Sequence, residues 1–89
     1  MDHHLASQLR QLRQELESGK TSLPQKRDSI DRLVRDIDDI LGTTSQPATP
    51  HLRGLRDRLI GTAAGFEAIH PELAKSIERV IEVLVSQNL

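Results

Sequence analysis

The chain has 89 residues, with 12 Lys or Arg and 13 Asp or Glu, so its formal net charge is -1. This balance excludes a broad basic field for nucleic acid or anionic lipid. The chain has no cysteine, which excludes a disulfide framework, a thiolate metal site and a cysteine nucleophile. Its apolar runs are too short to cross a bilayer, and Met1–His4 lack the pattern of a signal peptide. We therefore expect a small cytoplasmic protein.

The apolar residues are almost entirely aliphatic. The sequence has one Phe, one Met, no Trp and no Tyr. Aromatic side chains bury the most area per residue, and a domain of this size is marginally stable by itself. The composition therefore predicts self-association, with a homodimer as the first expectation.

The first predicted helix covers residues 2–18, with Asp2 as N-cap and Gly19 as the stop. Its apolar positions form a narrow heptad seam, typical of a helix that contacts one neighbour or a partner. The seam consists of Leu5, Leu9, Leu12 and Leu16. The second helix begins near Ser22 and ends at Gly42. Its stripe is wider, and its aspartates and arginines recur four residues apart, which favours ion pairs within the helix.

Residues 42–50 read as a flexible linker, because they contain two Pro, one Gly and four hydroxyl residues. A third helix should begin at Thr49, and the His70-Pro71 pair should separate it from a fourth. No segment alternates as a strand would. We therefore predict one all-α domain over residues 1–89, with helical hairpins at 1–41 and 51–89. They form a four-helix bundle or share a core in a homodimer, and whether the last two helices form a hairpin or one kinked rod stays open.

The third helix has a face of small residues opposite its leucines. Its members are Gly54, Gly61, Gly65 and Ala68. Each glycine costs about 1 kcal/mol relative to Ala inside a helix. One interpretation is a close contact with another helix, across a subunit interface. The other is that the glycines only loosen or bend the helix.

Charges at two helix ends oppose the helix dipole. Arg53, Arg56 and Arg58 lie near the start of the third helix, and Asp36, Asp38 and Asp39 lie near the end of the second. If these ends are neighbours, the charges form an inter-helix cluster. Alternatively, the arginines form a patch for phosphate, nucleic acid or an acidic partner, although the aromatic residues that stack on RNA are lacking.

No motif for a nucleotide, a metal or a catalytic nucleophile is present, so we expect no enzyme and no cofactor or metal site. The sequence instead favours a self-associating interaction or regulatory module with a possible protein partner. A peripheral membrane role for an amphipathic helix is a second alternative, but the polar faces carry mixed charge rather than a basic band. We thus expect neither nucleic acid nor membrane as the partner.

The run Phe66-Glu67-Ala68-Ile69-His70-Pro71-Glu72-Leu73-Ala74 is followed by a closing helix rich in Ile, Val and Leu. With the opening leucine helix, it resembles a family of short bacterial helical proteins known only as a domain of unknown function. The resemblance spans nearly the whole chain. It implies a free-standing helical protein and supplies no activity or catalytic residues.

Overall fold

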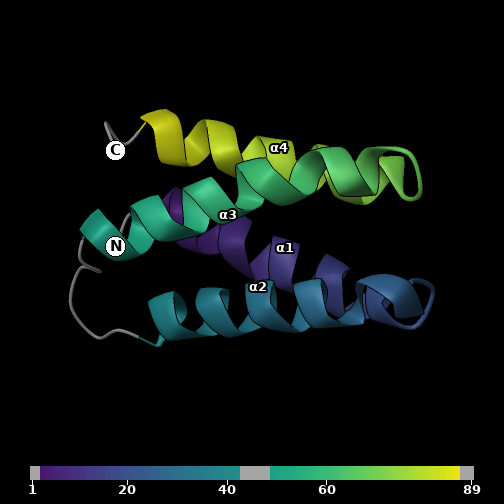
Figure 1. The fold of residues 1–89 in the computed structure, drawn as a ribbon. Helices are drawn as coiled ribbons and strands as arrows, with labels where there is room; N and C mark the ends of the chain where they lie inside the picture. The colour runs from purple at the N-terminus through teal and green to yellow at the C-terminus, as the bar shows by residue number, and fades with distance from the viewer. Residues whose placement is uncertain (1–2, 43–48, 87–89) are drawn as a thin grey trace.

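The computed structural model describes residues 3–42 and 49–86 (Figure 1), and at residue 49 it describes the backbone alone. These residues form four α-helices and one 3₁₀ turn, and no strand occurs among them. In chain order the elements are α1 (His3–Lys20), η1 (Pro24–Lys26), α2 (Arg27–Leu41), α3 (Thr49–Glu67) and α4 (Pro71–Ser86). The expected cap at Asp2 and most of the expected linker, residues 43–48, lie outside the described part of the chain.

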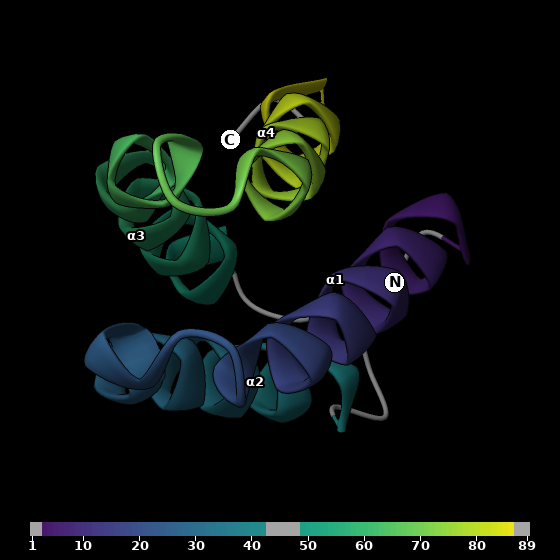
Figure 2. The ribbon, with the colours of Figure 1, turned by 90° about the vertical axis from the view of Figure 1, so that its right-hand side faces the viewer.

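The four helices close into a ring. Each helix contacts the next one along the chain, and α4 also contacts α1 (Figures 1 and 2). The packing between α3 and α4 is the most extensive, so these two helices form a hairpin rather than one kinked rod. The predicted all-α fold is therefore confirmed, and the packing of its helices is compatible with a four-helix bundle.

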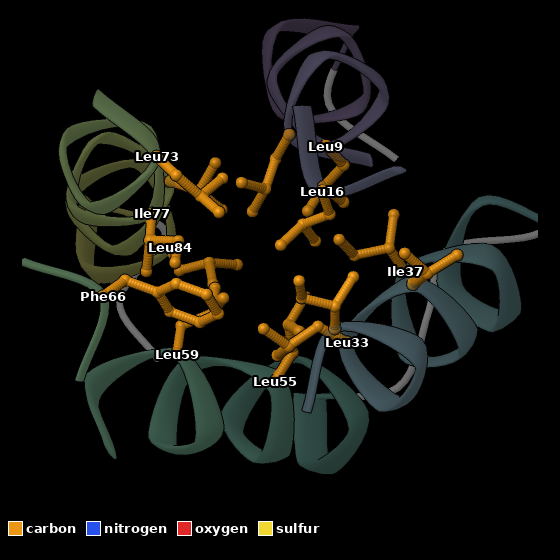
Figure 3. Close-up of a cluster of buried hydrophobic side chains, with 14 of the residues drawn as sticks. Leu9, Leu16, Leu33, Ile37, Leu55, Leu59, Phe66, Leu73, Ile77 and Leu84 are labelled. Atoms are coloured by element: carbon orange, nitrogen blue, oxygen red, sulfur yellow. The ribbon is translucent and has the colours of Figure 1, made fainter. Parts of the chain in front are cut away.

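The core lies inside this ring and is formed by all four helices (Figure 3). Phe66, the sole aromatic residue, is 0% exposed and is surrounded by aliphatic side chains. No polar or charged residue is buried among the described residues. Because the helices of one chain enclose these side chains, hydrophobic burial stabilises the bundle without a contribution from a second copy.

The leucine seam of α1 faces this core. Leu5, Leu9, Leu12 and Leu16 are each at most 1% exposed. Since α1 packs against both α2 and α4, the narrow seam serves two neighbours, not the single neighbour that its width suggested. The four leucines are occupied within the chain, and the expectation that they form an interface with a partner does not fit this packing.

Gly19 lies at the end of α1, as predicted. The helix ends at Lys20, and Gly19 itself is buried. A Cβ on Gly19 would lie 3.5 Å from Cδ2 of Leu73, at the start of α4. The carbonyl oxygen of Gly19 accepts hydrogen bonds from the backbone N–H groups of Ser22 and Leu23, at 3.1 and 3.0 Å. The end of α1 therefore lies beside the start of α4, at a distance where a Cβ on Gly19 would make ordinary van der Waals contact.

Aspartates of α2 connect it to the helices on either side. The ion pairs are Lys20–Asp31 and Arg13–Asp38 with α1, and Arg58–Asp36 with α3. The hydrogen bond from Lys20 lowers the pKa of Asp31, and that from Arg13 to Asp38 raises the pKa of Arg13. The four-residue spacing had suggested pairs within α2, whereas Asp31 and Asp38 pair with α1. The pair between Asp36 and Arg58 follows the alternative expectation of contacts between α2 and α3.

Candidate functional site

The candidate surface covers the C-terminal part of α3 and the turn that follows it, where the exposed residues carry little charge. Between residues 60 and 69, Glu67 is the only charged residue among the exposed positions. These positions are Ile60, Gly61, Ala64, Gly65, Glu67, Ala68 and Ile69. Ile60 is 53% exposed and Ile69 is 41% exposed. Single exposed apolar residues are common, so the candidate surface is defined by the low charge around Ile60, which lies within α3, while Ile69 lies in the turn after the helix.

The predicted small-residue face of α3 is directed to solvent. Gly54, Gly61, Gly65 and Ala68 are all exposed. A Cβ on Gly54 or Gly61 would meet nothing within 4 Å, and one on Gly65 would meet only the flexible end of Lys26, 3.2 Å away at Nζ. The close helix contact that these residues could make is therefore not made within the described residues of this chain.

Two of the three arginines near the start of α3 are paired with carboxylates. Arg58 pairs with Asp36 on α2, which is one contact of the charge cluster predicted between the end of α2 and the start of α3. Arg56 pairs with the adjacent Asp57 at 2.9 Å, and Arg53 is exposed. Because carboxylates accompany two of the three guanidinium groups, the attraction of this surface for a phosphate is weakened.

A polar groove of about 580 Å³ lies between α1 and α4. It is lined by Gln14, Glu15, Ser18, Gly19, His70, Glu72, Leu73, Lys75, Ser76 and Arg79. Oε2 of Glu15 is buried and has no hydrogen-bond partner among the described residues, while its Oε1 accepts from Gln11 at 3.5 Å. The lining therefore presents both a carboxylate acceptor and cationic donors to a polar ligand.

His70 has a structural role at one end of this groove. Its Nδ1 accepts the backbone N–H of Leu73 at 3.2 Å, in the first turn of α4. The N–H groups of Ile69 and His70 both donate to the carbonyl of Phe66, at 3.2 and 2.7 Å. His70 thus caps α4 and closes the turn from α3, in place of the usual Ser, Thr, Asn or Asp.

The groove could not be found from the sequence, because its walls come from segments about 50 residues apart and contain no motif. Among residues 3–42 and 49–86, no group of three or more His, Asp or Glu side chains is placed to hold a metal ion. None of the helices in the same part of the chain has both the length and the apolar character needed to cross a bilayer.

The fold and its surfaces define a small all-α protein with a core that is aliphatic except for Phe66, and with one weakly polar helix face. The chain belongs to the family described as a domain of unknown function, DUF4404, whose model matches residues 5–86. This match confirms the family resemblance suggested by the Phe66–Ala74 run and the flanking helices. No curated protein matches the chain. No solved structure matches it either.

Proposed function

We propose that this protein is a non-catalytic interaction module that self-associates through the outer face of α3. The observation that carries the proposal is the 53% exposure of Ile60 within a stretch whose exposed positions carry a single charge. Fully burying an Ile side chain contributes about 1.5–3 kcal/mol. Covering the exposed half of Ile60 in both copies of a dimer would therefore contribute about 2 kcal/mol.

The surroundings of Ile60 support a close approach by another helix. Gly61 and Ala64 are exposed beside it, and residues without long side chains let two helix backbones come near each other. The buried leucines of α1 are already used inside the bundle. Self-association through α3 therefore adds a contact between complete bundles and needs no exchange of core residues.

The first test is the solution mass of the wild type and of Ile60→Lys, by size-exclusion chromatography with light scattering. Refractive index must give the concentration, since the chain has neither Trp nor Tyr. We expect a dimer for the wild type and a monomer with unchanged helical circular dichroism for Ile60→Lys. Ser7→Lys, which adds the same charge at an exposed position of α1, should stay dimeric.

Two outcomes would overturn the proposal. A wild type that stays monomeric at high micromolar concentration would exclude self-association as the role of this surface. A dimer that persists in Ile60→Lys would show that another face carries the contact. The helical circular dichroism distinguishes loss of the dimer in Ile60→Lys from a variant that has simply unfolded.

A further inference from the structure

Three exposed residues of α3 share one stripe at heptad spacing: Arg53, Ile60 and Glu67. Seven residues correspond to almost two full turns, so successive members of the stripe drift by only about 20°. At a rise of 1.5 Å per residue, Arg53 and Glu67 lie about 21 Å apart along the helix axis, with Ile60 midway. The stripe thus has a positive end, an apolar centre and a negative end.

Neither charged end of this stripe is neutralised within the bundle. The ion pairs of α3 involve Arg56 and Arg58, and within the part of the chain that the structure describes, Arg53 and Glu67 have no ion-pair partner. Both side chains are therefore available to charges on another molecule.

We infer that α3 pairs with α3 of a second copy in antiparallel orientation, with the two-fold axis at Ile60; this inference rests on the proposed self-association. In this register Ile60 faces Ile60 of the second copy. Arg53 then faces Glu67 of the second copy, and the symmetry repeats that ion pair at the other end. One α3 helix thereby supplies an apolar contact flanked by two opposite-charge contacts.

Two alternatives to this arrangement place like charges together. A parallel pair would bring Arg53 to Arg53 and Glu67 to Glu67. An antiparallel pair shifted to a centre at residue 62 would bring Asp57 opposite Glu67. Like charges across an interface disfavour association, so the charge pattern favours the antiparallel orientation over the parallel one. Among antiparallel registers, a centre at Ile60 is favoured because it places Arg53 opposite Glu67 at both ends.

Charge reversal tests the register. Arg53→Glu and Glu67→Arg each convert two attractive contacts into two repulsive ones, and exposed pairs are worth a few tenths to 1 kcal/mol each. Each single variant should therefore weaken the dimer about tenfold in sedimentation equilibrium at low salt. The double variant Arg53→Glu/Glu67→Arg should recover the wild-type dissociation constant, because it restores attraction at both ends.

A cysteine cross-link tests the two-fold axis directly. The chain has no cysteine, so Ile60→Cys introduces one thiol, which meets the thiol of the second copy within the Cβ–Cβ distance of about 4 Å that a disulfide needs. Mild oxidation should give a covalent dimer on a non-reducing gel, whereas Ser7→Cys should associate as the wild type does but form little covalent dimer. An Ile60→Cys variant that resists cross-linking would contradict the axis.

The outcomes separate this inference from the proposal on which it rests. A dimer that Ile60→Lys disrupts, but whose charge reversals are not rescued in the double variant, would overturn the register and leave self-association through α3 intact. A wild type that is monomeric would overturn both. Rescue in the double variant together with cross-linking at residue 60 would support the antiparallel arrangement.

Discussion

Replacing Gly61 by Ala should stabilise the folded bundle. Gly61 lies inside α3 at an exposed position, and the new Cβ would meet nothing within 4 Å. Glycine in an exposed helix interior is about 1 kcal/mol less favourable than alanine. Because the added methyl group would touch no other residue, the helix propensity alone should decide the outcome. We expect the free energy of unfolding to rise by about 1 kcal/mol.

Gly54→Ala should act in the same way, since its Cβ also enters open space. The two positions are two turns apart on α3, so their effects should add to about 2 kcal/mol. Gly42→Ala is the contrasting variant, because its Cβ would lie only 3.1 Å from the carbonyl oxygen of Asp38. We expect a smaller gain there, or a loss.

Urea unfolding followed by circular dichroism at 222 nm measures these changes. At low protein concentration, the midpoint should rise while the dependence of the free energy on urea stays unchanged. For a domain of this size, each 1 kcal/mol should raise Tm by about 4–8 °C. A loss of stability in Gly61→Ala would refute the reasoning, because it would mean that another group fills the space beside Gly61 or that the backbone there is not helical.

Three further predictions concern the core, the α4 cap and one ion pair. Phe66→Ala should lower the free energy of unfolding by about 3–5 kcal/mol, because Phe66 is fully buried; a loss below 1 kcal/mol in urea unfolding would contradict its place in the core. His70→Ala should lose about 1 kcal/mol and His70→Asn should largely recover it in the same assay, because Asn can accept the Leu73 N–H; equal losses would contradict the cap. The hydrogen bond from Lys20 lowers the pKa of Asp31 in the folded protein. The stability that Asp31 contributes to the fold is therefore fully present above the pKa that Asp31 has in the unfolded chain, and it is lost as the pH falls through its pKa in the folded protein. The wild type should therefore exceed Asp31→Asn in stability at pH 7, and the difference should shrink below about pH 4; a difference independent of pH would contradict the pair.

The local features of the fold could be predicted from the sequence. Pro71 after His70 marked the break before α4, and the spacing of the aliphatic residues identified the buried faces, because both depend on neighbouring residues alone. The pairing of helices was harder to anticipate. The leucine seam of α1 looked wide enough to contact only one neighbouring helix, but α1 packs against both α2 and α4.

The tertiary contacts of single residues could not be predicted in this way. Gly19 resembled a helix stop, and its contact with Leu73 depends on the return of α4 to α1, more than 50 residues later. The groove beside Glu15 has the same origin. The small face of α3 was identified from the sequence, whereas the exposure of Ile60 within it became evident only once α4 was placed.

The closed ring of helices has a consequence for the order of the chain. The start of α1, the end of α2, the start of α3 and the end of α4 all lie at the same end of the bundle (Figure 1). Every helix already has its two neighbours, so the bundle has no privileged first helix. Consider a circular permutant that joins the end of α4 to the start of α1 and opens the chain between α2 and α3. In its sequence the α3–α4 hairpin precedes the α1–α2 hairpin, and it should keep the same core.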